Sequence, residues 1–338
     1  MNIDILWSTG TKFLGTKYAI MAGAMSWVSE HNLVSAISNA GGFGVLACGS
    51  MGADLLRKEI QLTKTKTHKP FGVNLITMHP DILALANVCI EEKVTHVVLA
   101  GGVPKSSYME ILRNAGIKIL CFAPTLTLAK RLIKLGADAI IIEGMEAGGH
   151  IGPVSTAVLA QEILPHIKEV PVFVAGGIGR GEMIVNYLRM GASGCQLGTK
   201  FVCAHESIAH KKFKEIFIKS NARDATVSIQ VDPEFTVIPV RALTNKATIA
   251  FNAAQRDVIL RYKQEMISKS EAQLEIEKFW AGALKKAVID GDIENGSVMA
   301  GQSVGMVEKE QSAEGIIQEL IAQANSALNN FDTKIFQS

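Results

Sequence analysis

The sequence predicts an α/β fold, a (β/α)8 TIM barrel with a mainly helical segment added after it. Short β-branched runs alternate with longer amphipathic runs that end at "AG" or "LG", which is the pattern of repeated β-α units. Eight such units occupy about 200 residues, close to the ~250 residues of this barrel. The alternation then stops near residue 220. We therefore expect the barrel in residues 1–220, and in 221–338 an extension that packs on the barrel and helps to cover its active site.

The expected strands are short apolar runs at 18–21, 43–47, 71–76, 96–100, 117–123, 137–142, 170–175 and 194–198. Helices are expected between them, for example at 30–41, 108–116, 126–136 and 182–191, where apolar residues recur at helical spacing before a glycine. The segment 221–246 breaks this pattern, and polar helical runs follow at 268–291 and 312–330. These runs form the expected extension.

The composition describes an ordinary globular chain and excludes several functions. Its 34 basic and 32 acidic residues give a net charge of +2, which supports neither a nucleic-acid partner nor a membrane partner. The five cysteines have no metal-ligand spacing, so we expect free thiols in a reducing compartment and no metal site. A secretory signal pattern and an apolar run of ~18 residues are both lacking. We expect a cytoplasmic location.

Two glycine-rich stretches follow the last two expected strands, "AGGIGRGE" at 175–182 and "QLGTK" at 196–200. Glycines there let backbone N–H groups approach a phosphate, and strands seven and eight are where such barrels commonly bind one. Most glycines only make turns, but two such loops on these two strands favour a binding site. The glycine spacing matches neither a dinucleotide fingerprint nor a P-loop. The sequence therefore predicts a phosphorylated ligand.

Motifs spread along the chain carry a family resemblance. In order they are "MAGAMSW", "GGFGVLA", "FGVN", "EGMEAGGHIGP", "VAGGI", "QLGTKF" and "GSVMAGQSVGMV". They resemble the superfamily of FMN-dependent enoyl-acyl-carrier-protein reductase II and nitronate monooxygenase, formerly called 2-nitropropane dioxygenase. The resemblance implies a barrel that binds FMN non-covalently, with the active-site histidine at His150. It implies cofactor contacts at Gly23, Ala24, Met25, Asn74, Glu143, Gly148, Gly149, Gly176, Gly177, Gln196, Leu197, Gly198 and Thr199.

Small differences within the motifs favour the reductase branch. Nitronate monooxygenases typically have a glutamine where this chain has Glu143 and an arginine where it has Ile151. "GSVMAGQ" is also similar to the reductases, whereas "AGAM" at 22–25 departs from their "QGGM". The resemblance thus implies reduction of an enoyl thioester in fatty acid biosynthesis by NADH or NADPH through FMN. The implied partner is acyl carrier protein or another acyl thioester. The resemblance is also compatible with a homodimer.

The loop at 143–153 is expected to carry the chemistry. A histidine can polarise a substrate carbonyl or place a proton at neutral pH, and this is the role that we assign to His150. Gly148 and Gly149 lack the Cβ atoms that would keep the chain away from a flat ring, and their N–H groups are candidate donors. Glu146 is expected to bind backbone groups and to have no catalytic role.

Other functions remain open from sequence alone. The first alternative is a nitronate monooxygenase that oxidises alkyl nitronates with oxygen, and a quinone reductase is a further one. A flavin-free phosphosugar lyase or isomerase would also explain the phosphate loops, and a flavin-binding protein without turnover is a third class. The basic clusters at 63–69 and 211–219 could bind an acidic carrier protein, although solvated surface is the simpler interpretation.

Overall fold

A computed structural model describes residues 2–335 of the chain, with side chains described to residue 330. Its centre is a parallel sheet in the order β1-β9-β8-β6-β5-β4-β3-β2. A parallel bridge between Met21 of β1 and Phe43, the residue just before β2, connects the two ends of this sheet, so that it closes into a barrel. The eight strands are β1 (Ile20–Ala22), β2 (Gly44–Ala47), β3 (Phe71–Ile76), β4 (His96–Ala100), β5 (Lys118–Phe122), β6 (Ala139–Glu143), β8 (Val172–Ala175) and β9 (Gly194–Leu197). The predicted barrel and its eight strands are confirmed.

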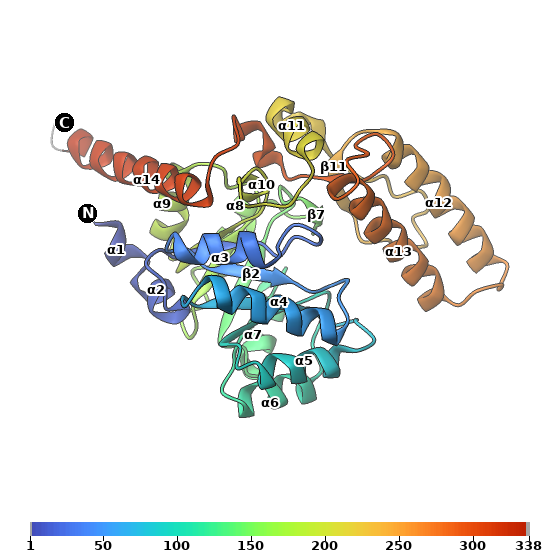
Figure 1. Cartoon of the computed structure of the whole chain (residues 1–338), viewed down its shortest axis with the longest axis horizontal. Coiled ribbons are helices and arrows are strands. Elements are labelled where there is room, and N and C mark those ends of the chain that lie inside the picture. Colours follow the sequence, from blue (N-terminus) through green and yellow to red (C-terminus); the bar gives the residue numbers. More distant parts are fainter. Residues whose placement is uncertain (1, 336–338) are drawn as a thin grey trace.

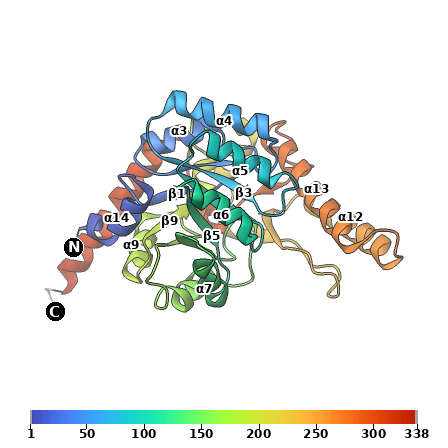
Figure 2. The ribbon, with the colours of Figure 1, turned by 90° about the horizontal axis from the view of Figure 1, so that it is seen from below.

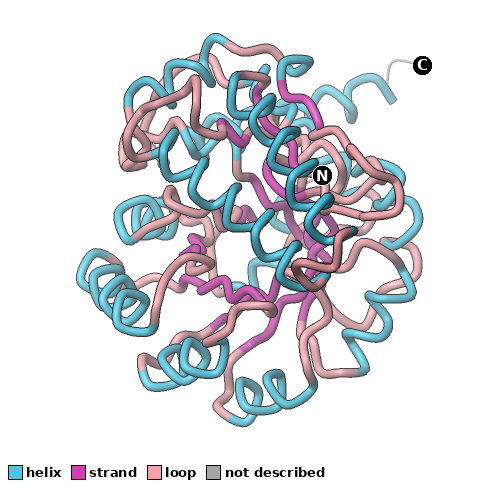
Figure 3. The backbone as a smooth tube through the Cα atoms, turned by 90° about the vertical axis from the view of Figure 1, so that its right-hand side faces the viewer, coloured by secondary structure: helices cyan, strands magenta, loops and turns pink. Residues whose placement is uncertain are grey.

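Helices surround the barrel (Figures 2 and 3). Seven of them follow successive strands: α3 (His31–Asn39), α4 (Ala53–Lys66), α5 (Ile82–Glu91), α6 (Ser106–Asn114), α7 (Leu126–Lys134), α8 (Thr156–Ile163) and α9 (Gly181–Arg189). Strand β9 is followed only by the short α10 (Thr199–Val202) and by α11 (Lys211–Lys219).

The remaining place in the helical ring belongs to α14 (Ala313–Ile335), which packs against both α9 and α3. The approach to α9 is close, because a Cβ on Gly181 would lie 2.0 Å from the carbonyl oxygen of Leu320. Ile316, Ile317 and Leu320 are buried in the barrel's own hydrophobic core. A segment that we assigned to the extension therefore completes the barrel's outer layer, while the division at residue 220 stays a prediction.

The N-terminal helix α2 (Ser8–Leu14) covers the end of the barrel where the strands begin, and the short α1 (Ile3–Leu6) contacts α9 and α14. Phe13 packs against His96 and Phe173, which stand at the starts of β4 and β8. The His96 ring lies 3.1 Å from the carbonyl oxygen of Phe13, and burial lowers its pKa to about 4. With this end filled, the carboxyl ends of the strands are the open end, where barrels of this kind have their sites.

The extension between α11 and α14 contains η1 (Ala222–Asp224), β10 (Ala225–Val227), β11 (Val240–Leu243), α12 (Lys246–Lys263), α13 (Lys269–Val288), β12 (Val298–Met299) and η2 (Gln302–Met306). Helices α12 and α13 form a hairpin that projects from the barrel (Figure 1). The hairpin has its own core, in which the rings of Phe251 and Trp280 lie 4.0 Å apart. The sequence predicted α13 and α14 but not α12.

Among the described residues, no helix is both long and apolar enough to cross a membrane.

A second, antiparallel sheet connects the extension to the barrel. Its central strand β11 pairs with β10, with β12 and with β7 (Gly149–His150). Strand β7 is part of the loop between β6 and α8, so the loop that carries His150 is held by a segment about 90 residues further along the chain. The sequence analysis did not identify β7.

Candidate active site

The residues that the family resemblance selects lie at the carboxyl ends of β1, β3, β6, β8 and β9, on one end of the barrel. Four of these strands, β1, β9, β8 and β6, are consecutive neighbours in the sheet. Parallel strands present their carboxyl ends at the same edge, so these loops meet although they are far apart in sequence. Asn74 lies on β3, which is not one of these four neighbouring strands.

The loops after β1 and β9 are in direct contact. The Gly23 N–H donates to the carbonyl of Leu197 at 2.8 Å. A Cβ on Gly198 would lie 3.5 Å from the sulfur of Met25. The Ser29 hydroxyl donates to the carbonyl of Gly23 at 3.1 Å and accepts from the N–H of Met25 at 3.0 Å. The predicted contacts at 23–25 and 196–199 therefore form one continuous surface.

Asn74 is buried in the second half of β3, and Gln196 is buried next to the last residue of β9. The Asn74 side-chain amide donates to the carbonyl of Val98 at 3.0 Å, which fixes the orientation of the amide. Its side-chain oxygen is then left to accept a hydrogen bond from a ligand.

Glu143 is the last residue of β6, next to Ala175 of β8. Its carboxyl group has no hydrogen-bond or ion-pair partner among residues 2–330. Burial raises its pKa to about 8. A carboxyl group in this state is mostly protonated at neutral pH and can donate a hydrogen bond as well as accept one.

This shifted pKa makes the stability of the ligand-free protein depend on pH. The folded pKa of about 8 lies above the ordinary value of 4.5, so the folded state holds the proton more tightly. The contribution of Glu143 to stability is full below pH 4.5 and is lost as the pH rises to about 8, by up to about 1.4 kcal/mol per pH unit. Denaturant unfolding of the apoprotein at several pH values should show this decline, and Glu143→Gln should make it shallower. Parallel pH profiles for the two proteins would contradict the prediction.

The loop after β6 is fixed at its base by Gly144, Glu146 and Thr156. A Cβ on Gly144 would lie 2.0 Å from the Thr156 hydroxyl oxygen, so only glycine fits there. The Glu146 carboxylate accepts from the Thr156 N–H at 2.8 Å and from its hydroxyl at 2.9 Å, at the start of α8. Glu146 thus binds backbone, as we expected.

Gly148 and Gly149 are required by the protein itself. A Cβ on Gly148 would lie 2.5 Å from the backbone nitrogen of Gly301. Gly149 has a φ of 77°, in the left-handed region, while its Cβ would meet only the Met299 sulfur at 3.6 Å. The sequence interpretation attributed these glycines to the approach of a flavin ring. In the structure, the packing of the loop on residues 299–301 and the backbone turn at Gly149 already account for them.

His150 lies at the outer end of this loop, with its side chain 41% exposed. Its Nε2 lies 3.0 Å from Oε2 of Glu277, on α13. Beneath the loop, buried Arg241 donates from Nε to the carbonyl of Met145 at 2.9 Å. Sequence analysis missed Arg241 and Glu277, because neither belongs to a motif and both approach the loop only through the fold.

The two predicted phosphate loops follow neighbouring strands, since Ala175 of β8 pairs with Gln196 of β9. Gly176 and Gly177 both have φ in the left-handed region, 95° and 70°. The Thr199 hydroxyl accepts from the N–H of Gly301 at 3.0 Å, so its own proton remains to be donated. Left-handed glycines that free the backbone N–H groups, next to a hydroxyl donor, suit a phosphate group. The residues of this end of the barrel thus fit a phosphorylated planar cofactor such as FMN.

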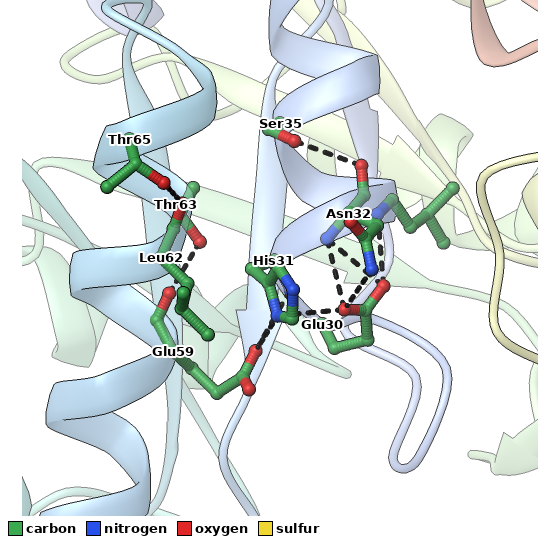
Figure 4. A network of polar contacts seen from close by, with 9 residues as sticks. Glu30, His31, Asn32, Ser35, Glu59, Leu62, Thr63 and Thr65 are labelled. Carbon is green, nitrogen blue, oxygen red and sulfur yellow. Dashed lines mark hydrogen bonds and ion pairs between the residues drawn. The ribbon is translucent and has the colours of Figure 1, made fainter.

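A separate polar cluster of Glu30, His31 and Glu59 joins α3 to α4 (Figure 4). The His31 Nδ1 lies 2.9 Å from a carboxylate oxygen of each glutamate. Glu30 also caps α3 by accepting from the N–H groups of Asn32 and Leu33. One ligand-type atom of each residue lies within 4.8 Å of the others, but these ion pairs and hydrogen bonds already explain the cluster as a helix cap and an interhelical tie.

The fold is a (β/α)8 barrel, and the glycine loops and the loop that carries His150 lie together at the carboxyl ends of its strands. Residues 8–89 and 84–323 match the model of the nitronate monooxygenase family, and the chain belongs to this family. The motif-based resemblance is thereby confirmed, and with it an FMN-dependent oxidoreductase.

Several relatives span nearly the whole chain. FabK from Thermotoga maritima is 34% identical with a TM-score of 0.85, covering 96% of this chain and 98% of that one. Nitroalkane oxidase from Streptomyces ansochromogenes is 27% identical with a TM-score of 0.77, covering 94% and 98%. A (3aS,4S,5R,7aS)-5-hydroxy-7a-methyl-1-oxo-octahydro-1H-indene-4-carboxyl-CoA dehydrogenase from Rhodococcus jostii is 29% identical, covering 93% and 94%. The relatives thus include more than one oxidoreductase activity.

Proposed function

We propose that the protein reduces an enoyl thioester, such as enoyl-acyl-carrier protein, with NADH or NADPH through bound FMN, in fatty acid biosynthesis in the cytoplasm. The observation that carries this proposal is the loop at 143–153. It begins at the mostly protonated Glu143, which has no hydrogen-bond or ion-pair partner in the described part of the chain, and it presents His150. It also has buried Ile151 where nitronate monooxygenases have an arginine. The likeness to FabK, a reductase of this branch, over nearly the whole chain supports the same choice.

Each part of the site has a task in this reaction. FMN, when bound, supplies the hydride transfer from nicotinamide to the enoyl group. The glycine loops at 176–177 and 198–199 would hold its phosphate, and Glu143 and Asn74 would donate to and accept from its ring. His150 stands at the exposed end of the loop, where it would polarise the thioester carbonyl or supply the proton that completes reduction.

The thioester part of the proposal has separate support. The Rhodococcus jostii relative is named as a dehydrogenase of a carboxyl-CoA compound, which is a thioester. Reduction of an enoyl thioester at its β-carbon and the reverse α,β-dehydrogenation of an acyl thioester both pass through enolate character at the thioester carbonyl, which the site must stabilise. A site built for one direction can therefore serve the other.

The second candidate is a nitronate monooxygenase, because the matching family model and a 30%-identical relative from Paraburkholderia phytofirmans bear that name. A single comparison separates the two. Purified protein is assayed with NADH or NADPH and a crotonyl thioester, and in parallel with propyl nitronate and oxygen. We expect FMN rather than FAD on denaturation, and faster turnover of the thioester. Preferential turnover of the nitronate would reject the reductase, and a colourless protein that does not take up FMN would reject both.

The two basic clusters lie at different places in the fold, and only one of them is near the site. Residues 63–69 end α4 and lead into the start of β3, at the closed end of the barrel. Helix α11 instead contacts η2, whose Gln302 N–H donates to the carbonyl of Glu146 in the site. Lys211, Lys212 and Lys219 are exposed there, whereas Lys214 is buried. If an acidic carrier delivers the thioester, α11 is the surface that we propose for it.

Charge reversal tests this surface. The double variant Lys211→Glu/Lys212→Glu should raise KM for a carrier-bound thioester several-fold and leave KM for the CoA thioester unchanged, because rim charges act mainly on association. The control Lys66→Glu/Lys69→Glu should change neither. An equal effect of α11 charge reversal on both substrates would rule out docking at α11.

A further inference from the structure

We propose that Glu277 of α13 is a positioning residue for His150: its carboxylate holds the imidazole in one orientation and one tautomer. The inference rests on the role proposed above for His150. It assigns a function to the helical hairpin, which neither the family motifs nor the flavin contacts involve.

The contact itself is specific to one ring nitrogen. Nε2 of His150 lies 3.0 Å from Oε2 of Glu277, and no other hydrogen-bond or ion-pair partner of this imidazole occurs among residues 2–330. The two side chains are 41% and 35% exposed. A half-exposed pair of this kind contributes little to folding stability, so its effect should be sought in turnover.

The backbone of His150 is fixed independently of this pair. In the antiparallel pairing of β7 with β11, His150 stands opposite Val240. The next residue, Ile151, donates its N–H to the carbonyl of Pro239 at 3.0 Å. With the backbone held on this side, the remaining freedom is rotation of the imidazole about its side-chain bonds, and Glu277 is the group that restricts it.

The position of Glu277 is also fixed, because α13 is attached to the mouth of the barrel. The Ser297 N–H donates to the carbonyl of Ala283 at 2.8 Å, which ties α13 to the segment leading to Gly301. Further along, Lys285 lies 5.1 Å from the centre of the Trp27 ring, in the loop after β1. Trp27 has a φ of 67°, an unfavourable conformation for a bulky residue that surrounding contacts must maintain.

The chemical consequence follows from the two nitrogens of the ring. A carboxylate that accepts from Nε2–H leaves Nδ1 directed elsewhere, as an acceptor in the neutral ring and as a donor in the protonated ring. Orientation of a catalytic imidazole by a carboxylate is a recurrent arrangement in enzymes. Glu277 would make Nδ1 the atom that meets the substrate.

The test uses full-length, FMN-loaded protein and the matched variants Glu277→Gln and Glu275→Gln. Both remove one carboxylate from α13, but Glu275 pairs with Arg261 inside the hairpin. Nitrogen-15 NMR should show His150 mainly as the Nε2–H tautomer in the wild type and in Glu275→Gln, and as a tautomer mixture in Glu277→Gln. We expect kcat to fall about 10-fold in Glu277→Gln only, with KM nearly unchanged, less than for a buried orienting carboxylate because this pair is half-exposed.

The double variant His150→Ala/Glu277→Gln separates this inference from the proposed function. If Glu277 acts through His150, the double variant should be no slower than His150→Ala alone. An unchanged His150 tautomer and unchanged kcat in Glu277→Gln would overturn the positioning role while leaving His150 catalytic. An additional loss in the double variant would show that Glu277 acts by another route. Full activity of His150→Ala would instead reject the proposed role of His150.

Discussion

Replacing His150 with alanine should leave FMN bound and the protein folded while turnover falls by about 10²- to 10⁴-fold, the usual cost of losing one positioned acid or polarising group. The side chain is exposed, and Glu277 is its one hydrogen-bond or ion-pair partner among residues 2–330, so its removal opens no cavity. The backbone pairing of β7 with β11 does not depend on the side chain. The expected defect is therefore confined to chemistry on the substrate.

Three measurements on His150→Ala test this prediction: flavin content, flavin reduction and turnover. Flavin content and the rate of flavin reduction by nicotinamide should match the wild type, and steady-state turnover of the enoyl thioester should be lost. Turnover at the wild-type rate would return His150 to an ordinary loop histidine. Loss of bound FMN would make it a cofactor ligand instead.

Gly148→Ala should have the second large effect, on the structure of the loop. The added Cβ would lie 2.5 Å from the Gly301 nitrogen and 2.6 Å from the Ala300 carbonyl carbon, both of them backbone atoms that cannot rotate away. We expect a stability loss of about 1–3 kcal/mol, typical of overpacking, and weaker FMN binding because the loop must move. Thermal unfolding and flavin titration measure the two effects.

Gly152→Ala is the matched control in the same loop. Its Cβ would have no atom within 4 Å, and its φ lies outside the left-handed region, so stability and flavin affinity should be unchanged. Equal behaviour of the two variants would show that the packing of residues 148 and 301 is not what fixes the loop. At Gly149 a substitution would be unfavourable mainly because the backbone φ is 77°. The space for a side chain is available there, since an added Cβ would meet only a methionine sulfur at 3.6 Å.

The barrel was predictable because its signals are local. Runs such as 71–76 and 96–100 are apolar and β-branched over their whole length, and the structure forms β3 and β4 over those same residues. The helices between the strands were predictable for the same reason. Their hydrophobic periodicity and the glycine that ends them both lie within about a dozen consecutive residues. The grouping of 23–25, 143 and 196–199 at one end also followed, because parallel strands share the edge at which they end.

The sequence by itself thus determined the barrel, the family and the loops that form the proposed cofactor site. The tertiary structure decided which distant residues complete that site: Glu277 at His150, Arg241 under Met145, and Gly301 against Gly148. It also placed α14, rather than a helix directly after β9, in the eighth position of the ring. These contacts join residues about 90 or more positions apart and leave no periodic or motif signal in one sequence, because they depend on where the whole extension folds back onto the barrel.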